Sequence, residues 1–304
     1  MVRLNNRIKK LVCFMLLCVT LLSGAAIAEY RIPVEDHELD AVEGLDENVI
    51  NILLIGTDTL EKDMDGGRAD VMMICSVNKK TGALRVASLQ RDTWVTIGEN
   101  GMQNKINAAH SFGGVNLLMQ TINRTFGMNI EKYVKVNFYA VCDIVDALGG
   151  VKVELEPEEI PSINRGSKEY ANVEPEQIPS GTREATLTGS QALAYARIRH
   201  LDNDFGRTAR QRKLLYAMAK KLSESSIPEM INTATVCFEY VQTNLSLLDM
   251  ISLATTVMKN GLNDMRMKAF PAEGDYHYGT GGGPSRLIID NDQVAQTLHE
   301  FIYQ

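Results

Sequence analysis

Cysteine, histidine and aromatic residues are scarce in this 304-residue chain, which holds five cysteines, five histidines and 6% aromatic residues. Three of the cysteines, Cys75, Cys142 and Cys237, lie singly within apolar segments and show no Cys-x-x-Cys spacing. An odd trio argues against a disulfide framework and against a zinc site, so we expect small buried hydrophobic residues at these positions. The histidines form no H-x-x-x-H pair or triad-like arrangement, which argues against histidine catalysis.

A net positive charge is also lacking. The chain has 31 Lys and Arg against 38 Asp and Glu, a formal net charge of −7, and a sequence pI of about 5.4. No global positive field therefore draws the protein to nucleic acid or to anionic lipid, and we expect no nucleic-acid partner. Any site for an anion must be local.

The N-terminal apolar run, Leu11 to Leu22, falls short of the roughly 20 residues that span a bilayer comfortably. Four basic residues between positions 3 and 10 precede it, and Ala26-Ile27-Ala28 fits a signal-peptidase site. We therefore predict that residues 1–28 are a signal peptide or an uncleaved membrane anchor, and that the rest of the chain is extracytoplasmic, at the membrane surface or cell wall.

The exported part divides into an acidic linker, residues 29–47, and one large α/β domain, residues 48–304. Val49 to Gly56 is a continuous apolar run, which predicts a strand buried on both faces. Two further apolar runs, 71–77 and 84–89, flank a turn-rich segment and predict a hairpin in which Gly82 takes a positive φ. The remaining predicted elements are strands at 93–97, 134–138 and 151–155, helices at 106–126 (broken at Gly113-Gly114), 139–148, 190–197, 207–222, 230–240 and 247–259, and a final strand and helix ending near Phe301.

The strand, helix and strand predicted between 134 and 155 favour a layered α/β sheet. The following segment, 156–184, is rich in proline and acidic residues and is too long for a plain connection. It is either a lid or a surface insertion.

The segment from Ala194 to Lys213 concentrates arginine at the start of a predicted helix. A helix N-terminus already carries about half a positive charge, so Arg207 and Arg210 in the first turns oppose the helix dipole and call for an anionic partner. Free backbone N–H groups and arginine forks together suit phosphate, and pyrophosphate in particular. The alternative is a solvated basic surface on which Asp202 and Asp204 are local partners.

Other charged residues stand at the ends of predicted strands, where open α/β sheets bind ligands. Arg68 and Arg91 are two of them, and Asp58 and Asp70 could meet at one rim of the sheet. Two carboxylates beside phosphates indicate Mg²⁺, although aspartates at such positions are more often turn or capping residues.

An ordered series of motifs resembles the LytR-CpsA-Psr family of bacterial cell envelopes across nearly the whole exported part, with core motifs between residues 51 and 222. The motifs are NILLIGTD (51–58), RADVMM (68–73), SLQRD (88–92), KINAA (105–109), DALGGV (146–151), QALAYARIRH (191–200) and DFGRTARQR (204–212). The resemblance implies a three-layer α/β/α sandwich with a central mixed sheet and an apolar tunnel for a polyprenyl chain.

The resemblance also implies the roles of the site residues. Arg91, Arg199 and Arg207 match the main pyrophosphate-binding arginines, and Asp58 and Asp70 match the metal-associated aspartates. Arg68, Arg197, Arg210 and Gln211 are supporting candidates for substrate binding.

The activity implied is a Mg²⁺-dependent phosphotransferase. A peptidoglycan hydroxyl attacks the glycan-proximal phosphorus of a polyprenyl-pyrophosphate-linked glycan, a teichoic acid, capsule or similar polymer, and polyprenyl phosphate leaves. The general base is not evident; Asp92 is the only candidate the motifs offer. Three alternatives stay open: a lipid pyrophosphate phosphatase, a non-catalytic binder of lipid-linked glycan, and an envelope-related regulatory protein.

Because Arg207 opposes the helix dipole, its removal is expected to leave the melting temperature of the ligand-free protein unchanged or slightly higher. Transfer is expected to collapse in the same variant.

Overall fold

The computed structural model describes residues 39–58, 67–99, 101–171, 174–225, 233, 241–260, 262, 264–279 and 286–304. These form two compact units. The helical unit contains the described residues from Asn137 to Val241, and the sheet unit contains those up to Val136 and from Gln242 onward. The predicted signal segment, 1–28, lies outside the described residues, as does most of the predicted linker.

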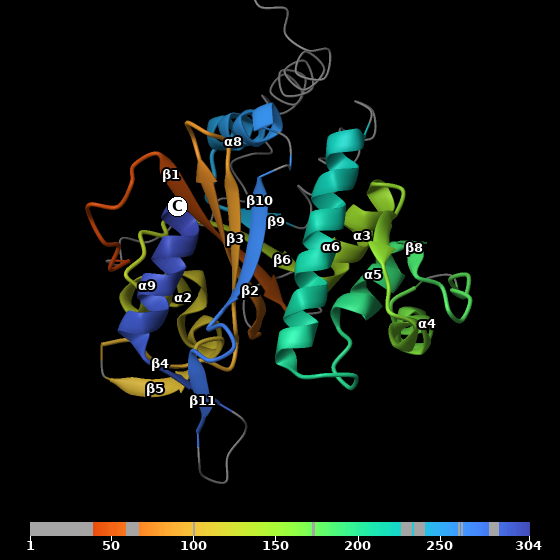
Figure 1. The fold of residues 1–304 in the computed structure, drawn as a ribbon, viewed down its shortest axis with the longest axis horizontal. Coiled ribbons are helices and arrows are strands. Elements are labelled where there is room, and N and C mark those ends of the chain that lie inside the picture. The colour runs from red at the N-terminus through yellow and green to blue at the C-terminus, as the bar shows by residue number, and fades with distance from the viewer. Residues whose placement is uncertain are drawn as a thin grey trace, which may run out of the picture. The chain divides into compact units, whose positions relative to one another are not determined.

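The sheet unit is built on a six-stranded sheet in the order β10-β3-β2-β1-β6-β9 (Figure 1). Strand β1 is antiparallel to β2, β2 is antiparallel to β3, and β3 is parallel to β10, so the sheet is mixed. The hairpin prediction is confirmed, with Gly82 at φ 74° in the β2–β3 turn. The strands are β1 (Val49–Thr57), β2 (Ala69–Asn78), β3 (Leu84–Leu89), β6 (Lys132–Asn137), β9 (Val241–Thr243) and β10 (Met265–Phe270).

Helices cover both faces of this sheet because β1 is apolar on both sides. Leu53 packs with α2 (Ala108–Phe126) and α9 (Asn291–Tyr303), whereas its neighbour Ile52 packs with α8 (Leu247–Asn260). Successive residues of a strand point to opposite faces, so a continuous apolar run serves two cores. The predicted three-layer α/β/α arrangement with a mixed sheet is confirmed; the apolar tunnel stays a prediction.

The predicted break in the first long helix is present in α2. Gly113 and Gly114 have non-helical backbone angles, and Gly114 lies at φ 65°. A left-handed φ is inexpensive only for glycine, which explains why the break falls at this pair.

The helical unit consists of α3 (Phe138–Ala147), α4 (Ile160–Gly166), α5 (Gly189–Ala196) and α6 (Asp204–Glu224), with a two-stranded ribbon of β7 (Val151–Glu154) and β8 (Glu184–Leu187). One hydrophobic core joins these elements. The expectation that the strand after α3 contributes to the layered sheet is wrong, because β7 pairs antiparallel with β8 instead. Its side chains alternate between buried and exposed, as suits a ribbon with one face in solvent.

The described residues of the proline-rich segment 156–184 belong to the helical unit. They form two short 3₁₀ turns, Pro157–Glu159 and Ser167–Glu169, on either side of α4. Ile160, Ile163 and Ile178 are buried in the core of the unit. This burial argues against a free lid and makes the segment part of the packing.

Two small ribbons complete the sheet unit: β4 (Trp94–Ile97) with β5 (Met102–Lys105), and β11 (Tyr276–Tyr278) with β12 (Leu287–Ile289). The predicted helix at 230–240 and most of the glycine run at 279–283 lie outside the described residues. Within the described part of the chain, no helix is both long and apolar enough to cross a membrane. Cys142 is buried, and burial raises the pKa of its thiol to about 12, as expected of a small core residue.

Candidate functional site

The sheet unit gathers charged residues where β1 ends, β2 begins and β3 ends. Antiparallel pairing of β1 with β2 and of β2 with β3 places these three points at the same rim. Gly56 pairs with Val71 and Thr57 with Ala69, so Asp70 is the extra residue of a β-bulge. Bulges often redirect a side chain near functional sites. The structure therefore brings Asp58 and Asp70 to one rim of the sheet.

Arg91 and Asp70 form a close ion pair at this rim. Nη1 of Arg91 donates to Oδ1 of Asp70 at 2.7 Å, and the two side chains are 20% and 9% exposed. Oδ1 of Asp58 accepts a hydrogen bond from the backbone N–H of Arg68 at 3.0 Å, and Asp58 is exposed. The arginine and both aspartates thus sit at the strand ends, while Arg68 contributes its backbone to the cluster.

Neighbouring residues fix the segments that carry these groups. Nζ of Lys105, at the end of β5, contacts Oδ1 of Asp92 at 2.7 Å. Nδ1 of His110 and the hydroxyl of Ser111 both lie 3.0 Å from the carbonyl oxygen of Gly67. Neither Lys105, in the KINAA motif, nor His110, beside it, is among the predicted site residues, and the contact of His110 with Gly67 is in keeping with a structural role.

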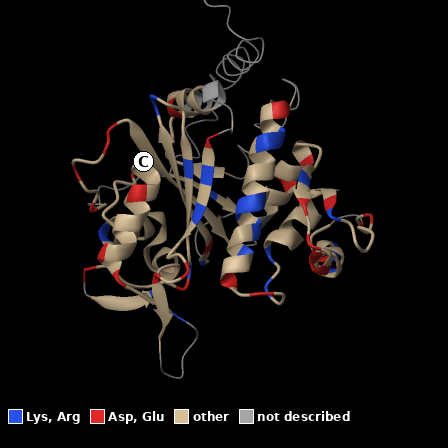
Figure 2. Ribbon diagram, in the orientation of Figure 1, with Lys and Arg blue, Asp and Glu red and all other residues tan. Residues whose placement is uncertain are grey.

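In the helical unit, arginines lie in the short loop before α6 and in the first turns of that helix. The Asn203 side chain caps the helix by accepting from the N–H groups of Phe205 and Gly206. Asn is among the preferred residues at this position because it satisfies otherwise unbonded donors. Basic residues then recur along α6 (Figure 2).

Arg207 is buried rather than solvated. Its side chain is 3% exposed, and Nη2 contacts the Asp204 carboxylate at 3.0 Å. Asp204 is the first residue of α6, where an acidic group also complements the helix dipole. The anionic partner expected for Arg207 is therefore present in the same chain, in Asp204. The expectation that removing Arg207 leaves the melting temperature unchanged or raised is wrong in its premise, because a buried ion pair would be broken.

Three residues accept hydrogen bonds from the guanidinium of Arg210. Nε donates to Oε1 of Glu159 at 2.7 Å, Nη1 donates to Oδ1 of Asp202 at 3.1 Å, and the carbonyl of Ile198 also accepts from Nη1 at 3.3 Å. Burial lowers the pKa of the guanidinium, but the hydrogen bonds to Asp202 and Glu159 outweigh it, so the net pKa is raised. These contacts tie α6 to the turn before α4 and to the loop after α5, which is a structural role.

The remaining predicted residues lie near the end of α5. The guanidinium of Arg197 stacks over the ring of Tyr170 at 5.4 Å, and Nε2 of Gln211 donates to the carbonyl of Ala196 at 3.5 Å. Arg197, Arg199 and His200 line a pocket of about 240 Å³, in which His200 Nε2 lies 2.7 Å from the Ser162 hydroxyl.

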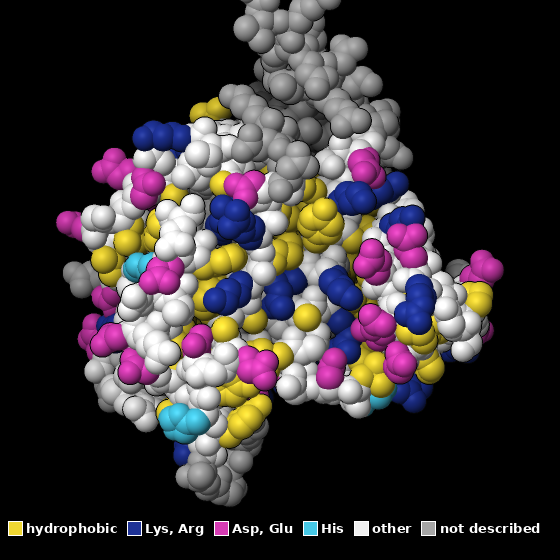
Figure 3. Space-filling view, in the orientation of Figure 1, with side chains coloured by type: hydrophobic (Ala, Val, Ile, Leu, Met, Phe, Trp, Pro, Cys, Tyr) yellow, Lys and Arg dark blue, Asp and Glu magenta, His cyan; other side chains and the backbone are white. Residues whose placement is uncertain are grey.

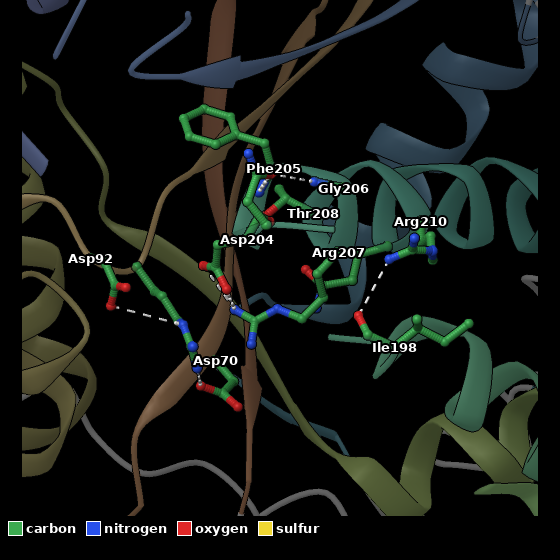
Figure 4. Close-up of polar contacts among 12 residues, drawn as sticks. Asp70, Asp92, Ile198, Asp204, Phe205, Gly206, Arg207, Thr208 and Arg210 are labelled. Carbon is green, nitrogen blue, oxygen red and sulfur yellow. Dashed lines mark hydrogen bonds and ion pairs between the residues drawn. The ribbon is translucent and has the colours of Figure 1, made fainter. Parts of the chain in front are cut away.

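Each unit therefore offers arginine groups suited to phosphate oxygens. Figure 4 shows Arg207 with Asp204 and Arg210 with Ile198 in the helical unit, and Asp70, which accepts from Arg91, in the sheet unit. Acidic and basic side chains are interspersed over the face drawn in Figure 3, in keeping with the absence of a net positive charge. Among the described residues, no group of three or more His, Cys, Asp or Glu side chains is placed to hold a metal ion.

Comparison with known proteins gives consistent matches. The model of the LytR_cpsA_psr family matches residues 20–301. A Bacillus mycoides protein, "Polyisoprenyl-teichoic acid--peptidoglycan teichoic acid transferase TagU", is 35% identical over 228 residues, 74% of this chain and 69% of that protein. The chain spans between 61% and 70% of the length of relatives with this name.

Solved structures agree with the sequence matches. "TagT bound to LI-WTA" is 25% identical, with a TM-score of 0.67 over 86% of this chain and 93% of that one. "LytR-CPS2A-psr family protein YwtF (TagT) with bound octaprenyl pyrophosphate lipid" is also 25% identical, with a TM-score of 0.64 over 86% and 93% of the two chains.

Proposed function

Because the chain belongs to the LytR-CpsA-Psr family, we propose that it transfers a phosphoglycan from a polyprenyl-pyrophosphate carrier to a hydroxyl of cell-wall peptidoglycan. The single observation that carries this proposal is the arginine-rich start of α6, where Arg207 is buried beside Asp204. Arginine forks at a helix N-terminus match the oxygens of a pyrophosphate, which would join the Asp204 carboxylate as a second anionic partner of Arg207. A pyrophosphate-bearing lipid is the anion named for a relative of the same fold.

The reaction would exchange a phosphoanhydride bond of the donor for a new phosphate ester bond to the acceptor. The acceptor hydroxyl oxygen bonds to the glycan-proximal phosphorus, the bond from that phosphorus to the bridging oxygen breaks, and polyprenyl phosphate leaves as the hydroxyl loses its proton. We assign Arg199 and Arg207 to pyrophosphate oxygens in the helical unit, and Arg91 to phosphate oxygens in the sheet unit. Their contribution is to align the phosphate and to neutralise charge on the leaving oxygens.

Asp58 and Asp70 fit a Mg²⁺ ion by their chemistry. Mg²⁺ commonly takes one or two protein carboxylates and completes its octahedron with water and substrate phosphate oxygens. Both carboxylates lie at one rim of the sheet unit, and Asp58 is exposed. When bound, the ion would supply Lewis-acid stabilisation of the phosphate charge.

Chelation tests this metal assignment. EDTA should lower turnover at least about tenfold because it removes the Mg²⁺ ion. Mg²⁺ added in excess should restore turnover. Asp58→Ala should lower turnover to a similar degree without unfolding, since the side chain is exposed. Undiminished turnover in EDTA would remove the metal from the mechanism.

We place the working enzyme outside the cytoplasmic membrane, with the membrane surface as the source of its lipid donor. The basic and apolar N-terminal pattern supports export. The glycan that is transferred is a teichoic acid or a capsule polymer, and the names of the relatives favour teichoic acid.

The decisive experiment measures dependence on the acceptor. Purified protein, a polyprenyl-pyrophosphate-linked glycan and peptidoglycan fragments should give a phosphodiester-linked product together with polyprenyl phosphate. Without acceptor, polyprenyl phosphate release should fall to background. Equal release with and without acceptor would instead identify a lipid pyrophosphate phosphatase, and binding with no release would identify a non-catalytic carrier.

A further inference from the structure

A second pocket lies in the sheet unit. Strands β4, β5 and β12 and the first turn of α9 border an open depression of about 690 Å³. The wall combines an aromatic ring with amide, hydroxyl, carboxylate and guanidinium groups. The residues that supply these groups are Trp94, Thr96, Gln103, Arg286, Asp290, Asn291 and Asp292.

The aromatic wall is held in place. Nε1 of Trp94 donates to Oε1 of Gln103 at 3.3 Å, and the guanidinium of Arg286 stacks over the indole at 4.8 Å. Such contacts limit the rotation of a large flat side chain, which also offers an apolar face and one polar edge. A fixed aromatic face with a few convergent polar groups suits a ligand that has both C–H faces and hydroxyl groups.

The charge of the pocket lining favours neutral ligands over anionic ones. Asp290 and Asp292 oppose the one guanidinium, of Arg286. Asp290 also caps α9 by accepting from the N–H of Gln293. Two carboxylates against one arginine would repel a chain of phosphates, whereas carboxylate and amide oxygens accept hydrogen bonds from sugar hydroxyls.

The pocket is joined directly to the segment that carries Arg91. Thr93 forms a parallel bridge with Leu287, and the N–H of Leu287 donates to the carbonyl of Asp92 at 2.9 Å. Trp94 is three positions after Arg91, a reach of at most about 11 Å along an extended chain. A ligand in this pocket would therefore lie close to one of the arginines assigned to the pyrophosphate.

We propose that the Trp94 pocket binds the uncharged sugar backbone of the acceptor, a wall glycan, rather than the anionic donor. This assignment rests on the proposed function for the identity of the glycan. The pocket would position the acceptor chain so that one hydroxyl faces the phosphorus, while its acidic lining keeps the phosphoglycan from binding in the wrong place.

Trp94 makes the proposal directly measurable, because it is the only tryptophan in the chain. Its fluorescence should change saturably on titration with soluble, uncharged oligosaccharides of wall glycan, and should not respond to inorganic pyrophosphate. The titration should be run on the Arg207→Ala protein as well as on the unaltered protein. Binding is then observed without turnover, so failure of transfer and failure of this pocket are distinguishable.

Substitution of exposed residues of the pocket lining provides a second test of the assignment. Gln103→Ala and Asp292→Ala should each weaken glycan binding at least about fivefold and raise the KM for acceptor, with the KM for donor unchanged. Gln296→Ala, farther along α9 and bonded to Glu300, is the matched control and should bind like the unaltered protein.

Three results would overturn the assignment. One is a Trp94 signal that ignores glycan in a protein that transfers normally. Another is an equal response to pyrophosphate, which would make the pocket an anion site. The third is an unchanged acceptor KM in both lining variants. If glycan binds saturably but no transfer occurs, the pocket assignment stands and the proposed reaction fails.

Discussion

Replacing Arg207 with alanine should lower the rate of glycan transfer about a hundredfold. Loss of one charge-assisted contact to a phosphoryl group commonly removes about 3 kcal/mol of transition-state stabilisation, which corresponds to that factor. The same change should lower the free energy of unfolding by about 1 to 2 kcal/mol. Breaking a fully buried pair costs more, but Asp204 is 24% exposed and can regain water.

Two companion variants make this result interpretable. Arg207→Lys should recover only part of the rate, because an ammonium group cannot contact two phosphate oxygens in the fixed geometry of a guanidinium. Lys213→Ala, an exposed change on the same helix, should leave both rate and stability close to those of the unaltered protein.

Rates and melting curves must be measured on the same samples. If Arg207→Ala melts far lower while its folded fraction transfers glycan normally, the residue only holds Asp204 and the α6 start in place. The assignment of Arg207 to pyrophosphate would then be wrong.

Much of the sheet unit could be predicted from local patterns. The unbroken apolar run of β1 predicted burial on both faces, and α2 and α8 do cover opposite faces. Gly82 and the Gly113-Gly114 pair were predicted because positive φ values leave a compositional signal. Strand ends then placed Asp58 and Asp70 at one rim without knowledge of their side-chain contacts.

What local patterns could not predict is long-range pairing. Arg210 meets Glu159, 51 positions earlier, and β7 pairs with β8 across the whole 155–183 segment. Spacing along the chain carries no signal for such partners. Asp202 and Asp204 are close in sequence and could be named as possible partners of the α6 arginines, whereas Glu159 could not.

Arg210→Ala should be the most destabilising of these arginine changes, with a loss of about 3 to 5 kcal/mol in the free energy of unfolding. Removing the guanidinium leaves the Glu159 side chain, only 6% exposed, without its charged partner. Its other oxygen still accepts from the Glu156 N–H at 2.9 Å, but one hydrogen bond does not replace an ion pair in a poorly solvated place. Asp202 is 38% exposed and should contribute little to the loss.

Denaturant titration of the single variants Arg210→Met and Glu159→Met and of the double variant would isolate the pair. The double variant should be less damaged than the sum of the two, because neither charge is then left buried alone. Arg183→Ala is the matched control: its contact with Glu156 spans 4.0 Å between side chains 78% and 63% exposed, so its loss should cost well under about 1 kcal/mol. Should Arg210→Ala prove as stable as that control while transfer falls, Arg210 would be a substrate-binding residue, and the contacts with Glu159 and Asp202 would not stabilise the helical unit.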